Sequence, residues 1–229
     1  MNYKILLFLI VFISIPSYSQ KKYLFDYMME YYRKDTDTSK VKKEYILTNS
    51  KDKSYTLRVF EKDSSNFDLS FLNLIGVSSK MILDKNSFSE AEFITSNCDF
   101  ISGYSYPSKF KTQDFNFIKK SDTLVGGEYC SHYVFKCNDP KKEKRKKLGT
   151  LHFILKKDAS CNLLFFDHPT VYEEWKSEEN ILNGILQEMF LELYDKNKNI
   201  SFYKLKQYAK INKYLIVPEE CDYTKSRKQ

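Results

Sequence analysis

The sequence lacks the motifs that mark the common catalytic and cofactor sites. It contains no Gly-x-Ser-x-Gly element of the serine hydrolases and no glycine-rich loop that would cradle a phosphate. The Cys-x-x-Cys and His-Glu-x-x-His spacings of zinc sites are also missing. We therefore predict no catalytic residues, no metal ligands and no cofactor, and we expect that the chain is not an enzyme.

Long apolar runs are missing too, apart from one near the amino terminus. There Lys4 precedes an apolar stretch over residues 5–15, which ends at Pro16 and is followed by small residues. The stretch has about half of the ~20 residues that a membrane-spanning helix needs. The pattern predicts a secretory signal peptide over residues 1–19. The remainder, residues 20–229, is expected to be a single β-rich domain with no transmembrane segment.

The charge and the cysteine content limit which partners and which cellular compartment are expected. The 37 basic and 30 acidic residues give a formal net charge of +7, a mild excess. Nucleic acid is not expected as the partner of an exported protein with this balance, whereas an anionic lipid surface is compatible with it. Export implies an oxidising compartment, periplasmic or extracellular, in which cysteines can pair. The odd number of cysteines leaves at least one unpaired and their pairing open; they are Cys98, Cys130, Cys137, Cys161 and Cys221.

Alternation of apolar and polar residues is the main structural signal. In residues 25–31 it places Phe25, Tyr27, Met29 and Tyr31 on one face, as in a half-buried strand, with a short helix as the alternative. Two hairpins are predicted from strands that flank polar turns, and Cys130 and Cys137 should lie on opposite faces of one of these strands. Further strands are predicted around the remaining alternating segments. The hairpins pair residues 41–48 with 54–61 and 128–137 with 149–157. The further strands cover 67–71, 80–84, 110–119, 185–194, 200–207 and 214–217, and 185–194 with 200–207 are expected to form a closing hairpin.

One segment favours a helix. Thr170 and Glu173 fit a capping box, and Val171, Trp175 and Leu182 follow at helical spacing. A helix continuing through Tyr194 is the alternative to a strand there. Many short strands with few helices predict a mainly β fold, a curved antiparallel sheet or half-barrel with one covering helix.

An apolar pocket under that helix is the predicted ligand site. Tyr55, Leu57, Phe71 and Trp175 are its candidate ligand-binding residues. The alternative is a fully packed core, with the protein acting through its surface.

The three histidines are candidates for a metal site or a catalytic pair. In the 128–157 hairpin, His132 should face Ile154, with His152 as a diagonal neighbour about 7–8 Å away, too far for a hydrogen bond. His168 is a candidate third metal ligand, but no ligand spacing supports a metal site. Cys130 and His132 share a strand face without an orienting third group, which favours a structural role.

A dense basic run interrupts the 128–157 hairpin and is interpreted as its loop. Its functional interpretation is contact with an anionic surface such as lipid headgroups, and its simpler one is a solvated hairpin tip. The contact residues are Lys141, Lys142, Lys144, Arg145, Lys146 and Lys147.

Three stretches resemble a known family. They are residues 25–27 with 48–55, residues 122–135 with Gly127, Tyr129, Cys130 and Tyr133, and residues 183–186. Together they are similar to the exported GLPGLI-type proteins of Bacteroidetes, which have no established activity. Glu128 stands between Gly127 and Tyr129, and Asn183 replaces the proline of the late motif. In outline the family is similar to periplasmic lipoprotein carriers, so the resemblance implies a half-barrel with a helical lid.

The sequence thus predicts an exported, non-enzymatic binding or carrier module for a lipid or acyl ligand. A structural or interaction module that binds another envelope protein is the first alternative. An uncharacterised hydrolase using His132 or His168 is the second.

Overall fold

The computed structural model describes residues 21–36, 38–74, 76–103, 112–158, 161–178, 181–194 and 199–221. The predicted signal peptide lies outside these residues. Within them the fold is mainly β, as predicted, with one large sheet and a few short helices. In the described part of the chain, no helix has the length and apolar character needed to cross a bilayer.

The elements follow one another along the chain with few long connections. The strands are β1 (Lys21–Thr36), β2 (Lys42–Thr48), β3 (Tyr55–Glu61), β4 (Asn66–Asn73), β5 (Val77–Asp84), β6 (Phe93–Thr95), β7 (Ile101–Gly103), β8 (Phe115–Lys119), β9 (Thr123–Val125), β10 (Glu128–Cys137), β11 (Thr150–Lys156), β12 (Ile185–Glu192) and β13 (Asn199–Val217). The helices are α2 (Lys85–Glu90), α3 (Pro140–Lys146) and α4 (Pro169–Ser177), with short 3-10 turns η1 (Cys98–Phe100) and η2 (Thr112–Asp114).

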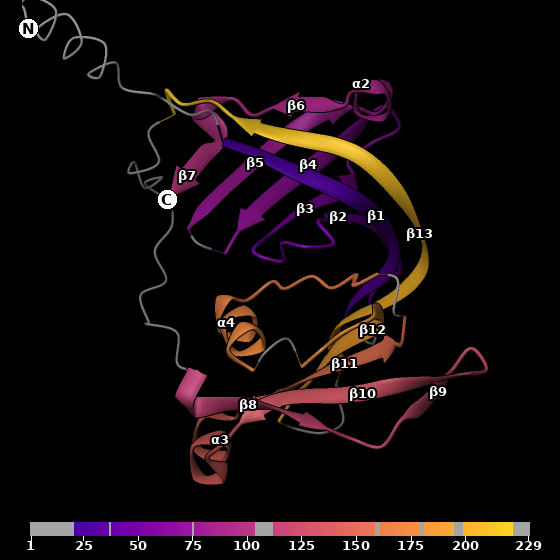
Figure 1. Cartoon of the computed structure of the whole chain (residues 1–229), viewed down its shortest axis with the longest axis vertical. Coiled ribbons are helices and arrows are strands. Elements are labelled where there is room, and N and C mark those ends of the chain that lie inside the picture. The colour runs from indigo at the N-terminus through magenta and orange to yellow at the C-terminus, as the bar shows by residue number, and fades with distance from the viewer. Residues whose placement is uncertain are drawn as a thin grey trace, which may run out of the picture.

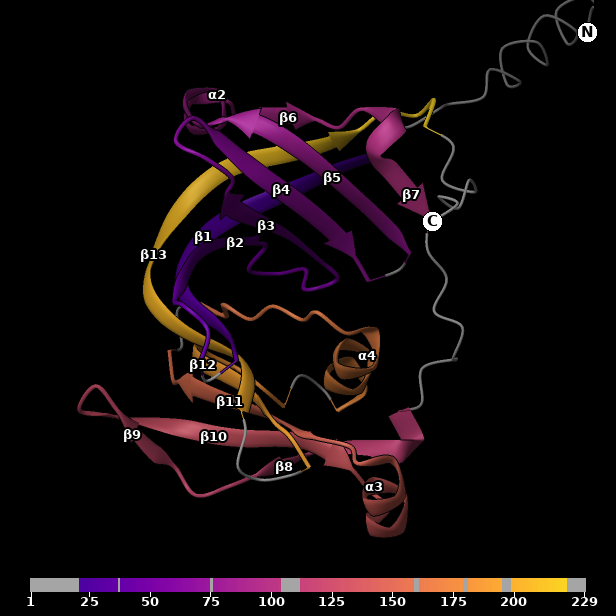
Figure 2. The ribbon, with the colours of Figure 1, turned by 180° about the vertical axis from the view of Figure 1, so that it is seen from behind.

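The sheet order is β7-β5-β4-β3-β2-β1-β13-β12-β11-β10-β8, with β6 added to β13 and β9 added to β10. All pairings are antiparallel except that of β6 with β13. The long strands β1 and β13 curve through the whole molecule, with β2 to β7 in one half and β8 to β12 in the other (Figure 1). Figure 2 shows from behind that α4 lies on the concave side, between the two halves. The sheet does not close into a barrel.

Strand β1 forms because its alternation suits a strand with one buried face. Phe25, Met29 and Tyr31 are fully buried, whereas Leu24, Asp26 and Met28 of the opposite face are half-buried. The strand prediction for this segment is confirmed, and the helical alternative is wrong. Register shifts opposite β13, between Phe25 and Tyr27 and between Glu30 and Tyr31, mark bulges that increase bending and twist.

All three predicted hairpins are present, but the basic run is not a loop. Residues 140–146 form helix α3, and Lys147 closes it in the left-handed conformation with φ 49°. The sequence does contain the signals for the start of this helix. The Asp139 side chain accepts hydrogen bonds from the first turn, and Pro140 stands at the first helical position, where its missing N–H costs nothing.

Helix α4 begins and ends earlier than predicted. His168, not Thr170, is the N-cap, since its Nδ1 accepts from the Thr170 N–H at 3.2 Å and Pro169 takes the first helical position. The helix ends at Ser177, so Leu182 lies outside it. Strand β12 then covers residues 185–192, so the alternative of a helix through Tyr194 is wrong.

Two hydrophobic clusters fill the two halves. The upper cluster lies among β1, β3, β4, β6 and the end of β13, with Phe25, Leu57 and Phe71 at its centre. The lower cluster lies between α4, the segment before it and β8 to β12, with Phe153, Phe165 and Phe166 fully buried. Strand β1 contributes to both clusters, so the two halves share their first strand.

A disulfide joins Cys98 in η1 to Cys221 beyond β13. It is consistent with an envelope protein, because disulfides persist in oxidising compartments. Cys130 and Cys137 are both free, buried thiols and do not pair with each other, as expected for residues on opposite faces of one strand.

Removing this disulfide should destabilise the fold, because it cross-links residues 123 positions apart and so restricts the unfolded chain. We expect the Cys98→Ser/Cys221→Ser variant to lose about 2–5 kcal/mol of unfolding free energy in urea. Reductant should lower the wild-type midpoint and leave that of the variant unchanged. A wild-type midpoint that does not respond to reductant would contradict the expectation.

Candidate functional site

Two arginines meet one fully buried carboxylate on the concave face of the sheet. Glu44 of β2 has an exposed side-chain fraction of 0%. Its Oε2 lies 3.2 Å from Arg33 Nη1 and its Oε1 lies 3.0 Å from Arg58 Nε. The register explains the meeting: Glu44 pairs with Tyr31 and Ile46 pairs with Arg58, so strand alternation places all three charged residues on one face.

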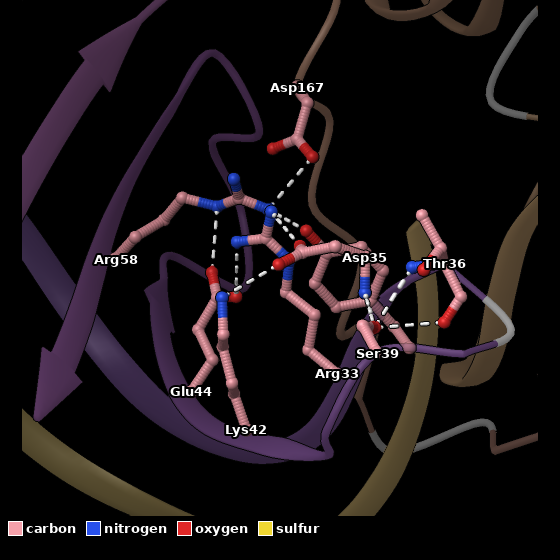
Figure 3. A network of polar contacts seen from close by, with 9 residues as sticks. Arg33, Asp35, Thr36, Ser39, Lys42, Glu44, Arg58 and Asp167 are labelled. Atoms are coloured by element: carbon pink, nitrogen blue, oxygen red, sulfur yellow. Dashed lines mark hydrogen bonds and ion pairs between the residues drawn. The ribbon is translucent and has the colours of Figure 1, made fainter. Parts of the chain in front are cut away.

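Asp167 links this cluster to the covering helix. Its Oδ2 lies 2.9 Å from Arg58 Nη2, and it directly precedes His168, the N-cap of α4. Figure 3 shows Arg58 between the carboxylates of Glu44 and Asp167, with Arg33 beside it. The ion pair therefore ties the start of α4 to strand β3.

Tyr203 of β13 packs between the two arginines. The Arg58 Nη2 donates to its hydroxyl at 2.6 Å. The guanidinium carbons of Arg33 and Arg58 lie 5.6 and 5.5 Å from the centre of its ring, within range of a cation–π interaction.

Burial and the neighbouring charges set the protonation of the cluster. Burial raises the pKa of the Glu44 carboxyl, and the guanidinium groups of Arg58 and Arg33 oppose that shift. Burial by itself would lower the pKa of Arg58, but Asp167 and Glu44 together raise it, so Arg58 stays charged. Burial raises the pKa of Tyr203 to about 12, so its hydroxyl stays protonated at neutral pH.

Arg33, Arg58, Asp167 and Tyr203 line a pocket of about 250 Å³, which we call the arginine pocket. Most of the other lining residues are apolar and come from β11, β12, α4 and the segment before α4. The pocket is lined by Arg33, Arg58, Leu151, Phe153, Phe165, Phe166, Asp167, His168, Val171, Met189, Leu191, Ser201 and Tyr203. Its lining therefore combines two guanidinium groups and one carboxylate with mostly apolar side chains.

The backbone beside this pocket is strained at Ser201. Its φ of 53° lies in the left-handed region, which costs a residue with a Cβ about 1 kcal/mol or more. The strain coincides with a register shift between β12 and β13, where Met189 pairs with Tyr203 but Leu191 pairs with Ile200. Strain of this kind gathers at functional sites, so it supports the pocket as the candidate site.

The predicted ligand-binding residues are divided between the two clusters. Tyr55, Leu57 and Phe71 are buried in the upper cluster. Trp175 is 7% exposed in the lower cluster, where its Nε1 donates to the Leu182 carbonyl at 3.1 Å. None of the four lines the arginine pocket. Their role in ligand binding stays a prediction.

Sequence reasoning missed the arginines and Glu44, although the sequence contains a signal for them. Arg33 follows Tyr31 at strand spacing, and Glu44 precedes Ile46 at the same spacing. A charged residue that continues the apolar face of an alternating strand is expected to be buried and paired.

The histidines lie closer together than predicted. His132 pairs with Ile154, as expected, but its Nε2 lies 2.9 Å from His152 Nδ1, so the predicted separation of 7–8 Å is wrong. The His152 ring stacks on Phe190 at 4.4 Å and its Nε2 lies 3.1 Å from Glu192 Oε2, which fixes its orientation. His168 caps α4 instead. The described residues contain no group of three or more side chains able to hold a metal ion.

Cys130 and the basic residues of α3 are the remaining residues that were singled out in the sequence. Burial raises the pKa of the Cys130 thiol, which makes it a poor nucleophile and favours the structural role. In α3, Lys142 lies 2.5 Å from Asp114, whereas Lys141, Lys144, Arg145 and the other two basic residues are exposed. Anionic-surface contact by this run stays a prediction.

The comparisons with known proteins give a weak structural similarity. No protein-family model matches the chain, and no curated protein matches it. Resemblance to the GLPGLI-type family therefore stays a prediction. The fold is similar to a domain from Vibrio parahaemolyticus described as an outer membrane lipoprotein-sorting protein, at 10% identity over 85% of this chain and 86% of that chain, with a TM-score of 0.29. It is also similar to a DUF1329 family protein from Desulfovibrio piger, at 11% identity over 84% and 86% of the chains, with a TM-score of 0.29. At these scores the likeness carries no argument about function.

Removing the buried carboxylate should destabilise the protein strongly. In Glu44→Gln the guanidinium groups of Arg33 and Arg58 lose their shared anion, and we expect a loss of about 3–5 kcal/mol in urea unfolding. Glu61→Gln is the control, because Glu61 forms an exposed ion pair with Lys43 and should cost less than about 1 kcal/mol. Equal losses of unfolding free energy in the two variants would show that the buried cluster does not stabilise the fold more than a surface ion pair does.

The histidine pair should make stability depend on pH. Burial lowers the pKa of both His132 and His152 below the 6.5 of the unfolded chain. The unfolded state therefore binds protons first, so the contribution of these two histidines to stability should be constant well above pH 6.5 and fall as the pH drops through it. The measurement is urea unfolding between pH 8 and pH 5.

The variant His132→Gln/His152→Gln should show a smaller change of unfolding free energy with pH than the wild type. Burial also lowers the pKa of His168. The pH profile of His168→Asn, which keeps an N-cap side chain, therefore measures how much His168 contributes to the pH dependence of stability. A double variant with the wild-type slope would contradict the assignment.

Proposed function

We propose that the chain is a binding module of the cell envelope for an amphipathic ligand, with an apolar chain and an anionic head. The observation that carries this proposal is the mixed lining of the arginine pocket, in which Arg33 and Arg58 lie among phenylalanine and aliphatic side chains. Ligand pockets are mostly apolar, with a few polar groups that orient the ligand. A carboxylate or phosphate head suits guanidinium groups, which donate to both oxygens of an anion.

The size of the pocket requires α4 to move for a long acyl chain. Its volume of about 250 Å³ is slightly below the roughly 300–1,000 Å³ of typical ligand sites. The ion pair of Arg58 with Asp167 ties the start of α4 to β3. The segment before α4 is also held by Thr48 and Lys53, which donate to the carbonyls of Leu164 and Asn162. An anionic head that binds Arg58 would compete with Asp167 and so weaken the ion pair. Binding and opening of the cover would then be coupled.

An interaction module that acts through its surface is the second candidate. A cavity of about 650 Å³ lies on β3 to β5 beside η1, and Ile82 and Phe100 in its lining are exposed. Phe93, on the neighbouring strand β6, is exposed too. An exposed apolar group of this kind suits another envelope protein. The expectation that the chain is not an enzyme stays a prediction.

Calorimetric titration of the protein from residue 20 onward with palmitate and with its neutral methyl ester tests the first candidate. We expect palmitate to bind at least about tenfold more tightly, because charge-assisted hydrogen bonds to the arginines depend on the anionic head. Leu191→Trp, which fills the arginine pocket, should abolish binding of both ligands.

Ile82→Trp is the matched control, because it adds the same side chain to the other cavity. It should bind palmitate like the wild type. Wild-type protein that takes up neither ligand, or a loss of binding in Ile82→Trp alone, would reject the arginine pocket and leave the interaction module as the function.

A further inference from the structure

One edge of the sheet is continuous and basic. Strand β8 is the last in the sheet order and pairs with the second half of β10, and β9 pairs with its first half. Helix α3 lies at the far end, where Lys142 meets Asp114 of η2. Figures 1 and 2 both show α3 and the β9–β10 hairpin at opposite ends of β10, along the same side of the molecule. We call β8, β9, the first residues of β10 and α3 the basic edge.

The hairpin end of this edge presents two apolar side chains to solvent. Leu124 is 60% exposed and Tyr129 is 79% exposed. They are direct cross-strand partners, so they form one pair next to the turn at Gly126 and Gly127. A tyrosine and a leucine exposed together suit the boundary between lipid headgroups and acyl chains, because the ring has an apolar body and a polar tip.

The rest of the edge has an excess of positive charge. The exposed basic residues are Lys119, Lys120, Lys141, Lys144, Arg145, Lys146 and Lys147. Most acidic residues of the edge are already engaged. Glu128 lies 2.6 Å from Lys156, Asp122 lies 3.8 Å from Lys157, and Asp139 caps α3. The seven exposed cations therefore give this edge a net positive charge.

We propose that the basic edge docks on an anionic lipid bilayer, with Leu124 and Tyr129 entering the headgroup region and the cations of β8 and α3 contacting the headgroups. The apolar pair and the charges act together, because neither two side chains nor a few exposed lysines hold a protein on a membrane by themselves. Lysines on an edge strand also prevent association between sheets. That simpler role predicts no selectivity between neutral and anionic lipid. The proposal does not depend on the ligand assigned to the arginine pocket.

Co-sedimentation of the protein from residue 20 onward with vesicles tests the proposal. Vesicles of phosphatidylglycerol and phosphatidylethanolamine should bind it, and vesicles of phosphatidylcholine alone should not. Raising the salt from 0.05 to 0.5 M should release it. Each cation contributes roughly fivefold to the affinity, so Lys144→Gln/Arg145→Gln/Lys146→Gln should weaken binding roughly a hundredfold.

Matched variants separate this surface from net charge. Lys51→Gln/Lys62→Gln/Lys80→Gln removes three exposed charges from connections and strands of the other half, and it should bind like the wild type. Leu124→Ser/Tyr129→Ser should weaken binding roughly tenfold while the urea midpoint stays unchanged, because both side chains are exposed.

Three results would overturn the proposal. One is equal binding to the phosphatidylcholine vesicles. Another is equal loss of binding in the two triple-glutamine variants, which would mean that net charge alone attracts the protein. The third is release of the bound protein by millimolar inorganic phosphate at constant ionic strength, which would mean that the edge binds a soluble anion.

Discussion

The pairing of the first described strand with the last one is the constraint on which the structure depends. Strands β1 and β13 pair almost from end to end, from Lys21 with Val217 to Thr36 with Ile200. Each also borders one half of the sheet, β1 through β2 and β13 through β12. Both hydrophobic clusters use β1, so neither half has a complete core without this pairing. The bulges in it allow the two strands to bend, and that bend places α4 between the halves.

The buried ion cluster lies where the two halves meet. Arg33, Glu44 and Arg58 come from the three strands β1 to β3, whereas Asp167 and Tyr203 belong to the cover and to β13. A buried ion pair rarely stabilises a fold more than well-packed apolar residues would, because both charges lose their water. Here the cluster positions the start of α4, because Asp167 pairs with Arg58. The strained backbone at Ser201, in the lining of the arginine pocket, supports that pocket as the candidate site.

Much of the fold could be predicted from local patterns, whereas the candidate site could not. Alternation identified β1, the hairpins and the register that sets His132 opposite Ile154. Helix α3 was missed because the lysine run received more weight than the capping signals of Asp139 and Pro140. The contact between His132 and His152 was missed because an ideal diagonal distance ignores how side chains lean toward each other. Arg58 and Asp167 are 109 residues apart, and no local pattern relates them.

The sequence by itself determined the fold class and the apolar face of strands such as β1, because strand alternation and turn chemistry are local properties of the chain. It also determined the basic character of the run in α3. Only the tertiary structure decided that Arg33 and Arg58 share a pocket with Asp167, and that Leu124 and Tyr129 stand exposed on the same edge as α3. The physical reason is that strand order and bending bring distant segments together. Neither can be read from the spacing of residues along one strand.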